Sequence, residues 1–214
     1  GESILSIVSQ YNLLSGGGCL PPLWGLGCFY RCKTEFDQEK VLAMAKTFRQ
    51  KHIPCDILGL EPGWQSQAYS CSYRWSEQRF PQPEKLLDQL RKEGFHVNLW
   101  EHAFTHPSAP IYKDLVPYSG DYLVWGGLVP DFATPEARRI FADFHRTLHN
   151  QGVSGFKLDE CDGSDYTGSW TFPNCASFPS GMDGEQYHSL FGTLYAQVIT
   201  EALNREPTLS EVRN

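Results

Sequence analysis

Residues 134–159 read TPEARRIFADFHRTLHNQGVSGFKLD and contain a complete helix pattern followed by a strand pattern. Thr134 is a favoured N-cap residue, and the Pro-Glu pair after it is typical of a first helical turn. Gly152 is the kind of residue that ends a helix. Between them, apolar side chains recur at helical spacing, at Ala137, Ile140, Phe141, Phe144 and Leu148. The run 153–158 then predicts a strand that leads directly into Asp159.

The same alternation of strand and helix patterns extends along the chain. Strands are expected over residues 22–29, 53–60 and 96–100. One helix is expected after Asp37, an N-cap residue, and a second from Pro83 in its first turn to Gly94. After a long loop that runs to about Glu185, residues 190–199 predict a last helix and residues 208–212 a last strand.

This order of elements predicts an α/β fold with a parallel sheet. A (β/α)8 barrel of the TIM type typically needs about 250 residues, whereas this chain has 214, some of them in long loops. We therefore expect an incomplete barrel of about the first five or six strands, with residues 1–214 as one catalytic domain that forms its N-terminal part. An open doubly wound sheet is the alternative, but Gly16, Gly17 and Gly18 precede the first strand instead of following it as a phosphate-binding turn would.

Composition excludes some classes of partner and leaves others open. The net charge of -7, with no run of Lys or Arg, argues against nucleic acid as a partner. No apolar stretch approaches the ~20 residues of a membrane span, and no signal pattern is present to indicate localisation. The seven cysteines mostly lie beside apolar residues, which favours buried thiols over disulfides. Cys28 and Cys32 have no second pair of ligands, so zinc is not expected.

Acidic residues follow several of the expected strands. Glu61, Glu101 and Asp159 each stand at a strand end, where the catalytic groups of a parallel barrel gather, and Asp131 lies in the loop before the long helix. Tryptophans lie in or beside the loops, at Trp64, Trp75, Trp100, Trp125 and Trp170. Carboxylates with aromatic neighbours suit a sugar site, although loop aromatics can equally pack the loops down. A hard cation held by Asp159, Asp162 and Asp165 is a weaker alternative, because the other ligands of a calcium loop are missing.

Lys157 and Asp159 form a pair that favours one chemical role. The two residues point to the same side of their strand, because side chains alternate along it. A neighbouring ammonium favours the ionised carboxylate, which is the form that attacks the anomeric carbon in a retaining glycosidase. A purely structural ion pair at the end of a barrel strand is the alternative.

Several motifs in the right order resemble glycoside hydrolase family 31, the retaining α-glycosidases that include α-glucosidases and α-xylosidases. The likeness covers nearly the whole sequence. It is carried by residues 20–27 (LPPLWGLG), 53–56 (IPCD), 79–81 (RFP), 130–137 (PDFATPEA) and 152–159 (GVSGFKLD), and by His188 near the start of the last helix.

The resemblance implies a retaining, exo-acting α-glycosidase that forms a glycosyl-enzyme intermediate, with Asp159 as its nucleophile. The same resemblance and the strand-end positions suggest substrate-binding roles for Glu61, Trp64, Trp100, Asp131, Lys157 and Asp162. It implies no metal and no cofactor, and an oligosaccharide or glycoconjugate as the partner. The rest of the parent polypeptide is then expected to close the barrel.

Three departures from the family pattern bear on this expectation. Glu61 stands where many members have an aspartate, and Glu101-His102 stands where an Asn-Pro pair is usual. With the long insert 163–184, these changes lean toward α-N-acetylgalactosaminidase-like or α-galactosidase-like members. The general acid/base of the family lies well beyond the nucleophile, and neither Glu206 nor Glu211 matches its motif, so it is expected beyond residue 214. A non-catalytic carbohydrate-binding or assembly module on the same scaffold is the alternative function.

Overall fold

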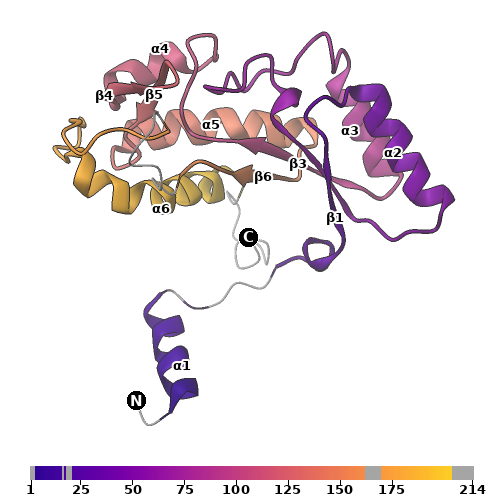
Figure 1. The fold of residues 1–214 in the computed structure, drawn as a ribbon, viewed down its shortest axis with the longest axis horizontal. Coiled ribbons are helices and arrows are strands. Elements are labelled where there is room, and N and C mark those ends of the chain that lie inside the picture. The colour runs from indigo at the N-terminus through magenta and orange to yellow at the C-terminus, as the bar shows by residue number, and fades with distance from the viewer. Residues whose placement is uncertain (1–2, 16, 18–20, 162–169, 204–214) are drawn as a thin grey trace.

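The computed structural model describes residues 3–15, 17, 21–161 and 170–203. Within them, four strands form a parallel sheet in the order β1 (Phe29–Cys32), β2 (Ile57–Leu60), β3 (His96–Glu101) and β6 (Gly155–Leu158). Consecutive helices connect them: α2 (Gln38–Gln50), α3 (Pro83–Lys92) and α5 (Pro135–Gln151), with α6 (Gly184–Leu203) after β6. Figure 1 shows α2 and α3 packed together at one end of the sheet and α5 and α6 at the other.

The sheet is part of a barrel that the described residues do not close. Each strand pairs in parallel with the one before it in the sheet, with Phe29 opposite Ile57, Leu58 opposite Val97 and Leu99 opposite Phe156. Strand order therefore follows chain order, as it does in a (β/α)8 barrel. The expectation of an incomplete TIM-type barrel is confirmed.

The helix ends are those that the local sequence dictates. Asp37 caps α2 by accepting the Lys40 N–H at 2.9 Å, and Thr134 caps α5 through its hydroxyl. Gly152 ends α5 with a φ of 114°, a backbone conformation that glycine adopts without steric cost. These helices were predicted correctly because capping signals depend on nearest neighbours in the chain.

Two predicted strands began too early. The strand expected over 22–29 was wrong at both ends and shares only Phe29 with β1 (Phe29–Cys32), since residues Leu23–Leu26 form a 3-10 helix after Pro22. The strand expected over 53–60 begins at Ile57, because Pro54 has no N–H to donate to a ladder. The strand expected over 208–212 lies outside the described residues.

Two α-helices and two strands among the described residues were not predicted from the sequence. Besides α1 (Ile4–Leu14) and the short α4 (Tyr112–Leu115), strands β4 (Ser119–Val124) and β5 (Gly127–Pro130) form an antiparallel hairpin. Its two-residue turn, Trp125-Gly126, has positive φ values of 49° and 70°. Two-residue hairpin turns need such values and usually contain Asn-Gly or Asp-Gly, so Trp-Gly gave no signal.

The interior of the domain has two parts, which differ in chemistry. The aliphatic region lies between the sheet and helices α2 and α3, and its buried residues include Val41, Leu58, Leu86, Leu90 and Leu99. The aromatic region lies around α5, α6 and the β4–β5 hairpin, and its buried residues include Phe104, Phe132, Phe141, Phe191 and Tyr195.

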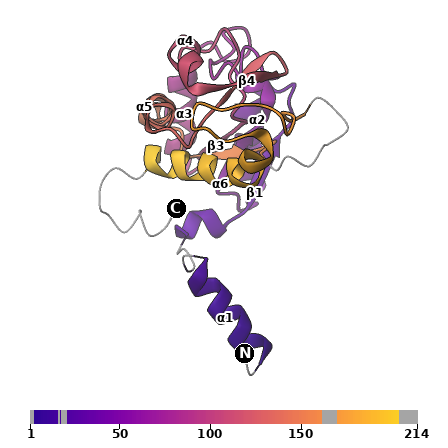
Figure 2. The same ribbon diagram turned by 90° about the vertical axis from the view of Figure 1, so that its left-hand side faces the viewer.

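Helix α1 lies away from both regions. In both ribbon views it projects from the rest of the domain, and none of its residues is buried (Figures 1 and 2). Among the helices that the structure describes, no helix, α1 included, is both long and apolar enough to cross a membrane.

The cysteines are partly as predicted. Cys32, Cys55 and Cys71 are buried free thiols, Cys161 is half-buried, and Cys28 and Cys175 are exposed. Burial raises the pKa of the Cys32 thiol to about 12, so that side chain behaves as a small apolar group. Cys19 lies outside the described residues.

Candidate active site

The parallel sheet brings charged residues from four strands to one edge. Arg31 lies near the end of β1, Glu61 follows β2, Glu101 ends β3 and Asp159 follows β6. Because parallel strands end on the same side of a sheet, these four residues share the edge at which barrel enzymes place their active sites. The fold therefore confirms the strand-end placement expected for Glu61 and Asp159.

Asp159 is held by donors on both carboxylate oxygens. Its Oδ2 accepts a hydrogen bond from the Trp100 indole Nε1 at 2.7 Å and another from the Lys157 ammonium. Its Oδ1 accepts the Glu160 N–H at 3.2 Å. Glu160 has a φ of 55°, an uncommon value for a residue with a Cβ. The Asp159 side chain stays 37% exposed, so it is fixed in place yet open to a ligand.

These contacts keep Asp159 ionised. Partial burial by itself raises the pKa of the carboxyl, but hydrogen bonds from Lys157 and Trp100 and the Lys157 charge lower it further, so the net pKa lies below its ordinary value. The predicted orientation of Lys157 toward Asp159 is therefore present in the structure. An ionised carboxylate can act as a nucleophile but not as a proton donor.

Glu61 is paired with a residue that sequence reasoning missed. The Arg31 guanidinium donates from Nε to Glu61 Oε1 at 2.8 Å and from Nη2 to Glu61 Oε2, a fork-like contact of the kind that arginine makes with carboxylates. The hydrogen bond to Glu61 raises the pKa of Arg31, and the charge of Asp159 adds to this effect. Arg31 therefore lies near both Glu61 and Asp159. In the sequence, only its position near the end of a strand could have indicated a role in the site.

Aromatic rings stand beside Asp159. The Tyr69 ring lies 5.4 Å from the ring of Trp100 and 5.0 Å from that of Trp125, and Trp125 lies 6.1 Å from Trp170. Tyr69 and Trp170 are 47% and 54% exposed, whereas Trp100 is buried. Burial and the nearby charges of Glu160 and Asp159 raise the pKa of Tyr69 to about 12, so its phenol stays protonated. Tyr69 lies in a loop and gave no signal in the sequence.

Like Trp100, two more of the expected site residues, Trp64 and Asp131, lie in the interior. Trp64 is 1% exposed, and its Nε1 donates to the Trp100 carbonyl at 2.7 Å, so it supports the backbone next to the site. Asp131 is fully buried, and its two oxygens accept the N–H groups of Ala133 at 3.1 Å and Ser180 at 2.7 Å. The structure does not bring either residue to the surface beside Asp159. Asp162 lies outside the described residues.

Metal ligands do not cluster in the part of the chain that the structure describes. Within residues 3–15, 17, 21–161 and 170–203, no group of three or more His, Cys, Asp or Glu side chains could hold a metal ion. Asp162 and Asp165, which were considered with Asp159 as a cation site, both lie outside the described residues.

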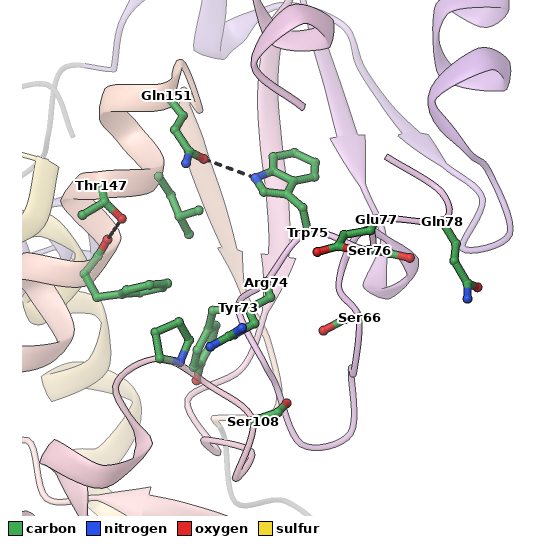
Figure 3. Close-up of a pocket in the computed structure, with 13 residues that line it drawn as sticks. Ser66, Tyr73, Arg74, Trp75, Ser76, Glu77, Gln78, Ser108, Thr147 and Gln151 are labelled. Atoms are coloured by element: carbon green, nitrogen blue, oxygen red, sulfur yellow. Dashed lines mark hydrogen bonds between the residues drawn. The ribbon is translucent and has the colours of Figure 1, made fainter. Parts of the chain in front are cut away.

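A separate groove opens on the outer side of the sheet. It has a volume of about 720 Å³ and is lined by residues of segment 66–78, by Ser108 and Pro110, and by the C-terminal part of α5. Figure 3 shows the Trp75 indole directed toward Gln151, to whose side-chain oxygen it donates at 3.3 Å. Trp75 is the one loop tryptophan noted in the sequence that lines this groove, whereas Asp159, Lys157, Trp100 and Glu61 do not line it.

Known proteins resemble this chain in sequence. The profile of the glycosyl hydrolases family 31 TIM-barrel domain matches residues 18–212. The alpha-xylosidase XylQ of Lactiplantibacillus pentosus is 25% identical over 225 residues, a match that covers 99% of this chain and 29% of that protein. An alpha-glucosidase of Saccharolobus solfataricus is 26% identical over 187 residues, covering 78% of this chain and 26% of that protein. The chain thus spans less than a third of the length of these relatives.

Solved structures resemble it in fold. A family 31 dextranase of Flavobacterium johnsoniae, complexed with glucose, has a TM-score of 0.80 at 23% identity, covering 95% of this chain and 26% of that one. A family 31 alpha-xylosidase from a soil metagenome, complexed with xylose, has a TM-score of 0.72 at 15% identity, covering 89% of this chain and 29% of that one. The structural likeness agrees with the open parallel sheet, and the profile match spans most of the sequence. The chain belongs to glycosyl hydrolases family 31, whose TIM-barrel domain it matches over residues 18–212.

Proposed function

We propose that this domain contributes the nucleophile of a retaining, exo-acting α-glycoside hydrolase, and that the nucleophile is Asp159. One observation carries the proposal. Asp159 is an ionised, partly exposed carboxylate, oriented by the Trp100 indole and the Lys157 ammonium at the carboxyl edge of the sheet. A nucleophile needs this combination of charge, access and fixed geometry.

The proposed reaction has two steps. In the first, an Asp159 oxygen forms a bond to the anomeric carbon while the glycosidic C–O bond breaks and the leaving oxygen takes a proton from a general acid. In the second, water attacks the same carbon, gives its proton to the conjugate base of that acid, and releases Asp159. Oδ1 is the better placed attacking atom. It accepts a single hydrogen bond, from the Glu160 N–H at 3.2 Å, whereas Oδ2 accepts two, from the Trp100 indole and the Lys157 ammonium.

The general acid in this proposal comes from outside the described residues. A general acid must be protonated before it reacts, which requires a raised pKa and an accessible position. Glu61 is instead bound by Arg31, and Glu101 is completely buried. The curated relatives are more than three times as long as this chain, which leaves room for the acid in the parent polypeptide.

The substrate side of the proposal combines residues expected from the sequence with Arg31 and Tyr69, which the structure adds. Glu61, with Arg31, presents fixed polar groups to sugar hydroxyls, and Tyr69, with the Trp125 ring against it, offers an aromatic surface. Lys157 and Trp100 act through Asp159, and Asp162 stays a proposed contact. The relatives named alpha-xylosidase and alpha-glucosidase support an α-glycoside as the substrate class. Glu61 in place of aspartate is our reason to include α-galactosides and α-N-acetylgalactosaminides.

Covalent labelling tests the nucleophile. The full-length protein that carries this domain is incubated with cyclophellitol-type inactivators of α-xylo, α-gluco, α-galacto and α-N-acetylgalactosamine configuration, digested, and mapped by mass spectrometry. We expect one configuration to label Asp159 and the Asp159→Asn variant to stay unlabelled. An adduct on any other residue would sink the assignment.

A carbohydrate-binding module without catalysis is the second candidate, and the outer groove is the observation that favours it. The groove combines the Trp75 ring with hydroxyl and amide side chains such as Ser76, Thr147 and Gln151, which are the groups that bind sugars. This candidate predicts that the full-length protein binds oligosaccharide but releases no aryl leaving group from any aryl α-glycoside. Turnover that Asp159→Ala abolishes would exclude it.

A further inference from the structure

A buried set of three polar side chains connects the end of β3 to two helices. Glu101, at the end of β3, is fully buried. Its Oε1 accepts a hydrogen bond from the Tyr195 hydroxyl of α6 at 2.7 Å, and its Oε2 lies 2.9 Å from Nε2 of His145 in α5. His145 is also fully buried, and its Nδ1 lies 2.8 Å from the Phe141 carbonyl. We call these three side chains the Glu101 network.

The hydrogens of the Glu101 network can be assigned from its acceptors. The Phe141 carbonyl can only accept, so His145 Nδ1 carries a hydrogen. Burial raises the pKa of Tyr195 well above its ordinary range, so its hydroxyl keeps a proton and donates it to Glu101. One further proton lies between His145 Nε2 and Glu101 Oε2. Whichever atom holds that proton, the pair is neutral overall and every polar atom of the pair has a partner.

Glu101 and the residue before it in β3, Trp100, also form hydrogen bonds with the proposed nucleophile, Asp159. The Glu101 carbonyl accepts the Asp159 N–H at 2.9 Å, and the preceding residue, Trp100, donates its indole N–H to Asp159 Oδ2 at 2.7 Å. Both contacts therefore originate from two consecutive residues of β3. The Glu101 side chain, in turn, is fixed by α5 and α6.

We propose that the Glu101 network positions Asp159 for attack, with Glu101, His145 and Tyr195 as positioning residues. The proposal rests on the proposed function of Asp159. Stability alone is a poor reason for such a network, because buried ionisable pairs can often be replaced by well-packed apolar residues without loss of stability. What apolar residues cannot supply is a directed set of hydrogen bonds that fixes the end of β3 at one position relative to α5 and α6. A misplacement of about 1 Å at a reacting atom can slow a reaction by ~10²-fold.

The test compares an apolar replacement with a hydrogen-bonding one in the full-length protein. The apolar variant is the triple Glu101→Leu, His145→Phe, Tyr195→Phe, which leaves no buried polar group without a partner. The conservative variant is Glu101→Gln, whose amide can accept from Tyr195 and donate to His145 Nε2. The readouts are the rate constant of covalent labelling at Asp159, the concentration dependence of that labelling, and the thermal midpoint.

We expect the triple variant to keep its thermal midpoint and inactivator affinity while its labelling rate constant falls by about 10-fold or more. We expect Glu101→Gln to stay within about threefold of the wild type. A matched control is Tyr187→Phe, another buried tyrosine of α6, whose hydroxyl contacts Pro130 and Phe132 instead of Glu101. It should lower the thermal midpoint and leave the labelling rate constant unchanged.

Two results would overturn the proposal: a triple variant that labels at the wild-type rate, or a Glu101→Gln variant as slow as the triple. If the triple does not fold, Tyr195→Phe alone takes its place, since it removes a single hydroxyl. If the wild type does not label at Asp159, the proposed function fails by itself. Hydrogen exchange of the peptide 153–161 then decides the positioning role, which requires faster exchange of the Asp159 amide in the variant than in the wild type.

Discussion

The aliphatic and aromatic regions of the domain differ in the side chains that fill them and in what those side chains fix. The aliphatic region is built mainly of branched side chains between the sheet and α2 and α3. The aromatic region contains stacked rings, such as Phe132 on Tyr195 at 5.8 Å, and adjoins the buried polar side chains of Glu101, Asp131 and His145. Branched side chains fill space without direction, whereas polar groups and rings fix orientation. We therefore expect the aliphatic region to hold the sheet together and the aromatic region also to set the geometry at Asp159.

The largest expected effect is on turnover, through Asp159 at the carboxyl edge of the sheet that lies between the two regions. Asp159→Asn should lower turnover of the full-length protein by about 10⁴-fold or more, as removal of a nucleophile does in other covalent enzymes. The fold should survive, because the side chain is partly exposed. Steady-state rates on aryl α-glycosides, with circular dichroism as the check on folding, measure this. Residual turnover above about a hundredth of the wild type would contradict the assignment.

Truncations in the two cores test the comparison directly. Leu90→Ala in the aliphatic region should cost about 2–5 kcal/mol of unfolding free energy, and Phe141→Ala in the aromatic region about 3–5 kcal/mol; both side chains are fully buried. Only Phe141→Ala should also slow labelling of Asp159, because Phe141 stacks on His145 with ring centroids 4.2 Å apart. Denaturant unfolding and labelling rates per folded molecule separate the two effects. Equal slowing by both truncations would remove the distinction between the regions.

A smaller effect concerns pH. Lys157→Met removes a donor that lowers the pKa of Asp159, so that pKa should rise and the acid limb of the labelling-rate profile should move to higher pH. A depressed carboxyl pKa contributes stability above the ordinary pKa of about 3.9, and that contribution is lost as pH falls through the folded-state value. The wild type should therefore be more stable than the variant at neutral pH, with the difference closing in strong acid.

Lys157→Arg serves as the control for this change, since it retains the positive charge. It should keep the acid limb close to that of the wild type. An acid limb that stays in place in Lys157→Met would mean that the hydrogen bonds from Trp100 and Glu160 set the ionisation of Asp159 without Lys157.

The smallest expected effect is at a helix end. Thr134→Ala removes the N-cap hydroxyl of α5 and its bond to the Asp131 carbonyl at 2.7 Å. It should cost about 1 kcal/mol and leave the labelling rate constant unchanged, because α5 keeps its core contacts. Thr134→Ser should restore most of the loss in a denaturant titration. A cost as large as that of Phe141→Ala would show that the cap, and not the core, holds the aromatic region.

The sequence was informative where structure depends on near neighbours. Helix α5 and strand β6 could be predicted because a cap, a proline and a glycine lie beside an apolar pattern in one continuous stretch. The β4–β5 hairpin could not, since its Trp125-Gly126 turn lacks the usual residues. The pairing of Arg31 with Glu61 joins residues 30 positions apart and depends on the register of β1 and β2. Likewise, nothing local distinguishes buried Asp131 from an acid that faces solvent.

The strand order β1-β2-β3-β6 also bears on how the domain is made. Each strand pairs with a strand that has already been synthesised, so the sheet can grow in step with translation. Among the paired strands of this sheet, β3 and β6 are the furthest apart in the chain, separated by α4, the hairpin and α5. Loop closure of that length costs entropy before any contact repays it, which makes this pairing the expected slow step. Because Glu101 and Asp159 meet across the same pairing, the nucleophile reaches its place only when that step is complete.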